Sequence, residues 1–101
     1  MIVVAAERRI REDYRQDFLT QMNKLTPIVI KEPGCLRYEI LVSVAEPGLF
    51  IILEEWETKT HLDDHLASPH MTEHKAITAP WSTDPLFISL YEVKSVERIT
   101  M

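Results

Sequence analysis

The four histidines of the chain all lie within residues 61–74. His61 and His65 form one pair with the spacing H-x-x-x-H, and His70 and His74 form a second pair with the same spacing. Histidine is the one side chain that changes its charge near neutral pH without a perturbing environment. The cluster therefore favours proton transfer or ligand binding, and its surroundings must decide between the two.

Metal binding is the first alternative, because two histidines four residues apart on a helix can share an ion. His61 and His65, with Asp64, resemble part of a zinc site. A zinc-protease motif, however, needs glutamate directly after its first histidine, and Leu62 takes that place. Leu62 must also face the core, which separates the environments of the two histidines. We therefore expect no metal site, and we expect His61 to face solvent.

His65 is the best candidate for a general base. On a helix it flanks the apolar ridge of Leu62 and Leu66, so it can lie at a pocket wall. A well-placed general base contributes on the order of 100- to 10,000-fold to a rate. The alternative is a histidine at a helix end that is satisfied by the backbone or by Glu55.

The other candidate site residues are polar or aromatic. Arg8 shares one face of the first predicted strand with its apolar residues and is suited to hold an oxyanion. Tyr38 and Trp56 would be aromatic walls for a planar substrate, or simply core. His70 and His74 would be further polar pocket residues, although His70 in a first helical turn can also be a capping or packing residue.

Two other groups are not expected to supply a catalytic carboxylate pair or a nucleophile. Glu54 and Glu55 are neighbours in a strand, so they point to opposite faces and do not form a glycosidase-like carboxylate pair. Cys35 begins a strand with no histidine nearby in sequence, which is typical of a small buried hydrophobe.

The bulk properties predict one domain, residues 1–101, in the size range of a single core. The net charge of −5 and the lack of a long basic stretch argue against nucleic-acid binding. The apolar run Ile2–Ala6 is too short to span a membrane. The single cysteine cannot form an internal disulfide, which favours the cytoplasm.

The elements that would position these residues follow from periodicity. Ile2–Ala6 is a β-branched run typical of a strand. A helix is predicted from about Arg11, and Pro27 should kink it or break it near Leu25. Its apolar stripe consists of Tyr14, Phe18, Met22, Leu25 and Val29.

The second half continues with two strands, Cys35–Ser43 and Leu49–Trp56, joined by a turn. Thr58 or Thr60 can cap the next helix, and Ser68-Pro69 begins a second short helix through about Ile77. A last strand is predicted over Leu86–Val96. The order is β-α-β-β-α-β, an α+β ferredoxin-like antiparallel sheet.

The sheet is predicted to be apolar on both faces, although two helices cover only one. Along the third strand, Phe50 and Ile52 point one way and Ile51 and Leu53 the other. A wholly apolar second face would be an exposed patch unless something covers it. A second copy of the chain is the economical cover, so we expect a homodimer through the open sheet face.

Three motifs resemble the antibiotic biosynthesis monooxygenase superfamily, and the small quinol monooxygenases within it. They are E-P-G-C-L-R-Y-E at residues 32–39, E-E-W-E at residues 54–57, and H-L-A-S-P-H-M at residues 65–71. The resemblance spans nearly the whole chain. It implies a dimeric α+β barrel whose pocket lies between the helices and the concave sheet face.

The resemblance also implies oxygenation of a quinol or polyphenolic aromatic substrate by O2 without a cofactor. Such a substrate supplies the electrons once a base has made its anion, and His65 would be that base. Alternatives are a non-catalytic small-molecule binder or stress-response dimer, an isomerase, and a haem-degrading enzyme with His74 as its axial ligand. The haem alternative is disfavoured, because His65 and Arg8 stand where those relatives have tryptophan and asparagine.

Overall fold

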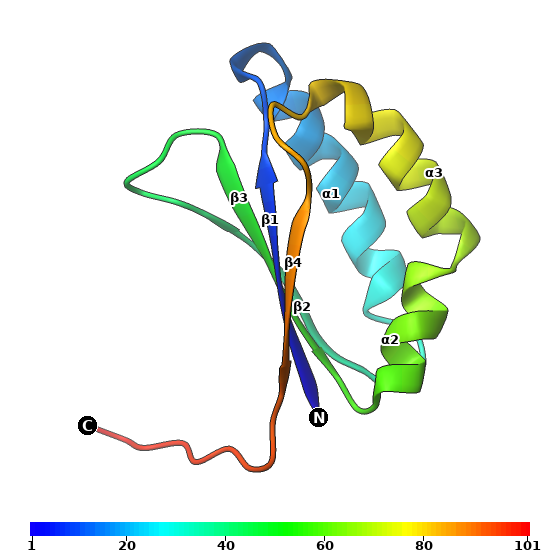
Figure 1. The fold of residues 1–101 in the computed structure, drawn as a ribbon, viewed down its shortest axis with the longest axis vertical. Coiled ribbons are helices and arrows are strands. Elements are labelled where there is room, and N and C mark those ends of the chain that lie inside the picture. The colour runs from blue at the N-terminus through cyan, green and yellow to red at the C-terminus, as the bar shows by residue number, and fades with distance from the viewer.

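The computed structural model describes residues 1–101 as a four-stranded antiparallel sheet with its helices on one face (Figure 1). Its elements are β1 (Ile2–Arg9), η1 (Glu12–Tyr14), α1 (Arg15–Val29), β2 (Cys35–Val42), β3 (Leu49–Trp56), α2 (Lys59–Leu66), α3 (Pro69–Thr78), η2 (Ala79–Trp81) and β4 (Phe87–Glu92). This order confirms the predicted α+β, ferredoxin-like fold. None of the helices is long and apolar enough to cross a membrane.

The strand order β2-β3-β1-β4 places β1 and β3 at the centre of the sheet. The first strand is longer than predicted, because β3 pairs with it from Ile2↔Trp56 to Arg9↔Leu49. Every second residue of both strands is buried towards the helices, as a strand with period two requires. Arg8 and Glu54 are the two charged residues that this alternation places on the buried face.

Pro27 was predicted to kink the helix or break it near Leu25, and the break does not occur, because α1 continues through Pro27 to Val29. Proline cannot donate a backbone hydrogen bond to residue i−4, which here is Asn23. Both residues lie on the exposed side of the helix, where water can satisfy that carbonyl. The buried side carries the predicted stripe from Phe18 to Val29 and packs on the sheet, with the Phe18 and Phe50 rings 4.9 Å apart.

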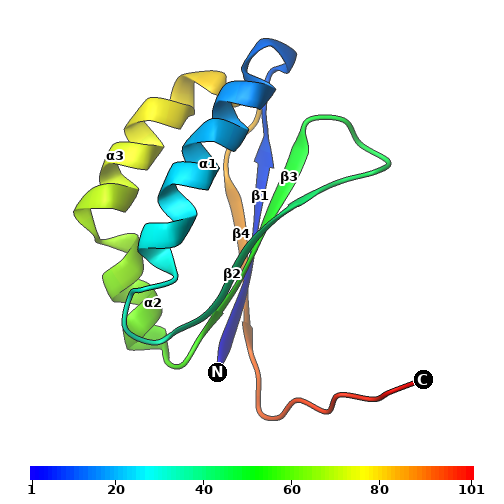
Figure 2. The ribbon, with the colours of Figure 1, turned by 180° about the vertical axis from the view of Figure 1, so that it is seen from behind.

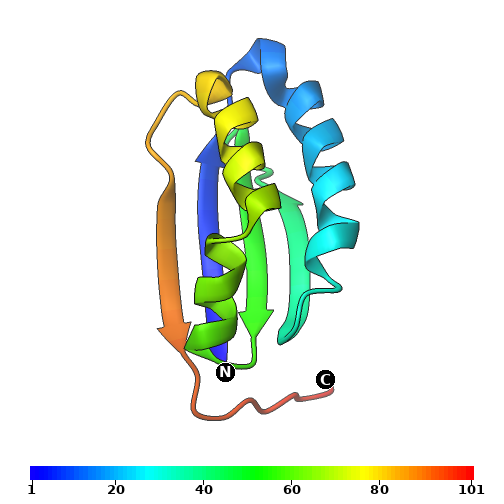
Figure 3. The same cartoon turned by 90° about the vertical axis from the view of Figure 1, so that its right-hand side faces the viewer.

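The predicted boundary at Ser68-Pro69 is confirmed. The Thr58 side chain caps α2 by accepting a hydrogen bond from the backbone N–H of His61. Ser68 caps α3 in the same way through Met71, with Pro69 at the start of the helix. The two helices meet at an angle and pass over the sheet beside α1 (Figure 3). The cap therefore separates the two histidine pairs onto different helices.

The last strand is shorter than the predicted Leu86–Val96, because its partner strand begins at Ile2. Beyond the strand, the N–H of Val93 donates to the carbonyl of Met1 at 2.9 Å. Residues 94–101 then extend away from the sheet, as Figures 1 and 2 show.

The face of the sheet turned away from the helices is uncovered in this single chain (Figure 2). Leu41, Phe87 and Tyr91 are exposed, and the strand register places them on that face beside the half-buried Ile51 and Leu53. This face therefore carries the predicted apolar residues, together with the ion pairs that Arg37 forms with Glu39 and Glu55.

Candidate active site

A cavity of about 40 Å³ lies between the buried face of the sheet and the helices α2 and α3. Apolar residues make up most of its wall, with Leu86 and Ile88 on the side of β4. Its polar lining residues are Arg8, Tyr38, Glu54, His65, His74 and Lys75. Four of the six predicted site residues thus meet around one cavity.

A second, open hollow of about 270 Å³ adjoins the cavity. Arg8, Lys75 and Leu86 line both spaces. The enclosed space alone is far below the roughly 300 Å³ or more that small-molecule pockets typically have. A planar aromatic ligand would therefore place one edge in the cavity and extend past Arg8 into the open hollow.

His65 is almost fully buried, at 1% exposed, and its ring is fixed from both sides. Its Nδ1 donates a hydrogen bond to Oε2 of Glu32 at 2.6 Å, because an ionised carboxylate only accepts. Trp56 packs on the ring with centroids 4.7 Å apart. Nε2 has no hydrogen-bond partner and lies 3.8 Å from Glu54. The nitrogen on the Glu54 side is thus free to take a proton.

The electrostatics keep this base neutral. Burial lowers the pKa of His65, and the hydrogen bond that His65 donates to Glu32 opposes that effect. A neutral imidazole with its proton on Nδ1 presents its lone pair at Nε2. Glu32 would then stabilise the imidazolium that forms, as the carboxylate does in a catalytic triad.

Glu32 is brought to α2 by the turn between α1 and β2. Gly34 in that turn has φ +78°, a conformation that favours glycine, and a Cβ there would collide with the ring of His61. Glu32 also contacts the second histidine pair, since its Oε1 lies 3.2 Å from Nε2 of His70. His70 does not line the cavity, and it lines a separate hollow between α1 and α3 instead.

Glu54 is a buried carboxyl group opposite His65. Burial raises its pKa to about 7, although the hydrogen bond from Trp56 opposes the shift. Trp56 Nε1 donates to Oε1 of Glu54 at 3.0 Å. Trp56 is 0% exposed and lies behind these two residues, so it supports the site and does not form the aromatic wall that was predicted. Glu54 can exchange a proton at neutral pH.

Tyr38 does line the cavity, with its ring at 67° to that of His65 and the two centroids 5.8 Å apart. Burial raises the pKa of Tyr38, and the carboxylates of Glu54 and Glu32 raise it further. The phenol is therefore neutral at physiological pH and acts as a wall or a hydrogen-bond donor.

His74 and Arg8 form the other end of the cavity. Burial and, to a smaller extent, the positive charge of Arg8 lower the pKa of His74 to about 4. Nη2 of Arg8 donates to the hydroxyls of Thr78 at 3.0 Å and Ser82 at 3.1 Å. Arg8 thus provides a fixed positive charge beside a neutral imidazole.

Metal-compatible spacing occurs at Glu32, His65 and His70, whose ligand atoms lie within 4.8 Å of one another. His61 and His65, the pair considered from the sequence, do not point to a common site. Nδ1 of His61 contacts the Thr58 hydroxyl at 2.8 Å on an exposed surface. The 2.6 Å contact between Glu32 and His65 is a charge-assisted hydrogen bond.

Sequence reasoning missed Glu32, Glu54 and Lys75. The strand alternation already placed Glu54 on the face of Phe50 and Ile52, and a carboxylate among buried residues is a marker of function. Glu32 could not be found in this way, because its meeting with His65 depends on the path of the turn after α1. Glu55, the expected partner of His65, lies on the opposite face and pairs with Arg37.

Known proteins with similar sequences are named as probable or putative monooxygenases. The family model for antibiotic biosynthesis monooxygenase matches residues 1–77. The Escherichia coli K12 protein named "Probable quinol monooxygenase YgiN" is 38% identical over 81 residues, which cover 70% of this chain and 78% of that protein. Rv0793 of Mycobacterium tuberculosis is 25% identical over 89 residues, covering 88% and 87% of the two chains.

Solved structures support the fold. A conserved protein from Methanosarcina mazei Go1 superimposes with a TM-score of 0.88 over 92% of each chain, at 27% identity. A Deinococcus radiodurans protein gives a TM-score of 0.92 over 100% of both chains, and at 24% identity it shows the fold alone.

Proposed function

The chain belongs to the antibiotic biosynthesis monooxygenase family, and we propose that it oxygenates a quinol or polyphenolic aromatic substrate with O2 and without a cofactor. The observation that carries this proposal is the buried pair of His65 and Glu32, whose free Nε2 lies on the side of Glu54 and the cavity. The resemblance to a protein named as a quinol monooxygenase supports the substrate class.

The substrate hydroxyl gives its proton to Nε2 of His65, and Glu32 stabilises the resulting imidazolium through Nδ1. The quinolate anion then passes one electron to O2 far more readily than the neutral quinol does. Recombination of the two radicals puts oxygen on the ring. Glu54, with a pKa of about 7, receives the proton from His65 in turn and returns the base to its neutral form.

The electrons balance without an external reductant. For a dihydroxynaphthalene, one oxygen atom enters the ring and the other leaves as water. The substrate supplies all four electrons and becomes a hydroxynaphthoquinone. The protein is required to provide only a base, an apolar cavity and groups that hold the anion. Tyr38 and the neutral His74, which both line the enclosed cavity, would hold the substrate oxygens there.

We also propose that the protein acts as a homodimer and in the cytoplasm. The exposed apolar face of the sheet favours a second copy as its cover. The free thiol of Cys35, half-buried in β2, favours a reducing compartment.

Oxygen uptake with a dihydroxynaphthalene tests the proposed activity, with autoxidation as the blank. We expect His65→Ala to lower the enzymatic rate by about 100-fold or more. His61→Ala is the matched control, because His61 lies on the same helix but its ring contacts Thr58 on the surface. Added EDTA should leave the rate unchanged.

Two results would overturn the proposal. A wild-type rate equal to the blank, together with ligand binding, would show a non-catalytic binder. A rate that EDTA abolishes would point to a metal at Glu32, His65 and His70 instead.

A further inference from the structure

Arg8 is a buried guanidinium without a carboxylate partner. It is 8% exposed, and its hydrogen bonds use only Nη2, towards the hydroxyls of Thr78 and Ser82. Nε and Nη1 make no hydrogen bond, and the side chain lines both the cavity and the open hollow. A buried charge is costly unless it is paired, so this cation is suited to an anion that arrives with a ligand.

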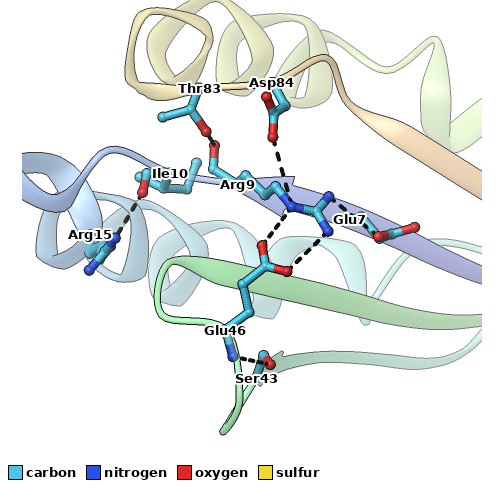
Figure 4. Close-up of polar contacts among 8 residues, drawn as sticks. All are labelled: Glu7, Arg9, Ile10, Arg15, Ser43, Glu46, Thr83 and Asp84. Atoms are coloured by element: carbon cyan, nitrogen blue, oxygen red, sulfur yellow. Dashed lines mark hydrogen bonds and ion pairs between the residues drawn. The ribbon is translucent and has the colours of Figure 1, made fainter.

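Arg9, the next residue of the same strand, is a cation that is paired with carboxylates. Arg9 points to the other side of β1 and binds Glu46 at 2.7 Å, with Glu7 and Asp84 at 3.5 and 3.8 Å (Figure 4). Asp84 is the one carboxylate that lines the open hollow, and it is directed to Arg9. Arg8 is therefore left without a counter-ion inside the protein.

The groups around Arg8 leave its charge uncompensated. The ring of Phe18 lies under the guanidinium, 5.2 Å from the ring centroid. His74 is neutral at physiological pH. The second cation, Lys75, lines the same two spaces and is not paired with any carboxylate. The outer end of the site is thus positive, whereas its inner end holds the base.

We propose that the substrate of this site is a hydroxylated aromatic carboxylic acid, whose carboxylate binds Arg8 and Lys75 while its oxidisable ring reaches towards His65. This inference rests on the proposed function. Hydrogen bonds from a guanidinium to a carboxylate are charge-assisted, and Nε and Nη1 of Arg8 are both available to donate one because only Nη2 is used inside the protein. Leu86, which lines both spaces, would pack on the ring between the two ends.

A matched pair of substrates tests the inference through a ratio. The pair is 1,4-dihydroxy-2-naphthoate and the same dihydroxynaphthalene without its carboxylate, compared by kcat/KM. We expect the acid to be preferred by about tenfold or more, as hydrogen bonds to a charged group imply. Arg8→Gln should reduce the ratio to about one, and Arg8→Lys should retain part of it.

Arg37→Gln is the control, because Arg37 lies on the opposite face of the sheet and pairs there with Glu39 and Glu55. It should leave the ratio unchanged. A variant that merely folds poorly would lose activity on both substrates equally, and the ratio would stay the same. An unchanged ratio in Arg8→Gln, or no preference in the wild type, would overturn the inference.

Binding of a ligand that cannot be oxidised separates this inference from the proposed reaction. Calorimetry with 2-naphthoate should show binding to the wild type that Arg8→Gln weakens by about tenfold or more, with 2-naphthamide as the uncharged control. Such binding without oxygen uptake would support the anion site and refute the oxygenase. Oxygen uptake with equal binding of naphthoate and naphthamide would support the oxygenase and refute the anion site.

Discussion

At the scale of single residues, the site consists of titratable groups whose environments differ within a few ångströms. His65 is held neutral by burial, whereas Glu54 is held close to half-protonation at neutral pH. The importance of His65 could be predicted from its place beside an apolar ridge. Its hydrogen bond to Glu32 could not, because these residues are 33 positions apart and meet only through the turn after α1.

Glu54→Gln should remove a pH dependence of stability. The pKa of Glu54 is about 7 in the folded protein against an ordinary value of 4.5, so between these values the folded state keeps a proton that the unfolded state has lost. The contribution of Glu54 to the free energy of unfolding therefore falls as pH rises from about 5 to 8, by at most about 3 kcal/mol. Glutamine can still accept the hydrogen bond from Trp56.

Urea unfolding at about pH 5.5 and about pH 8 measures this difference. Relative to the variant, the wild type should become less stable at the higher pH. Glu55→Gln, on the exposed face of the same strand, is the control and should follow the wild type. A gap between wild type and Glu54→Gln that does not change with pH would contradict the assignment.

At the scale of elements, most of the fold could be predicted from periodicity. The two-residue alternation of β1 and β3 and the stripe of α1 identify which faces are buried. The ends of elements were less predictable, because they depend on partners. β4 ends where β1 begins, and α1 continues past Pro27 because the unpaired carbonyl of Asn23 lies on the exposed side of the helix.

Pro27→Ala should stabilise the protein, because alanine restores the N–H that α1 lacks at this position. We expect a gain of about 1 kcal/mol, less than the roughly 3 kcal/mol propensity difference, since proline also restricts the unfolded chain. Lys24→Ala, at an exposed position in the same helix, should change stability by less than about 0.5 kcal/mol. A loss of stability in Pro27→Ala would contradict a continuous helix.

At the scale of the whole molecule, one face of the sheet carries the site beneath the helices, and the other face is left uncovered. The helices that cover the first face leave Phe87, Tyr91 and Leu41 exposed on the second. The sequence predicted this asymmetry from the apolar alternation of two strands. A pairing of two sheets would bury these residues and enclose the back of the site.

Phe87→Glu should convert a dimer into a monomer in sedimentation velocity, because it places a charge within the apolar face. Ile28→Glu is the matched control: Ile28 is 49% exposed on α1, on the helical side of the molecule. It should leave the dimer intact. A wild type that sediments as a monomer at micromolar concentration would contradict the proposed assembly.

Isotope labelling tests the central claim most directly, because it follows the oxygen atom itself. The wild-type protein is given a dihydroxynaphthalene under ¹⁸O2, and the organic product is analysed by mass spectrometry. We predict a hydroxynaphthoquinone that carries one ¹⁸O atom, formed without hydrogen peroxide and lost in His65→Ala. An unlabelled quinone formed together with hydrogen peroxide, or a labelled product that His65→Ala forms equally fast, would contradict a monooxygenase with His65 as its base.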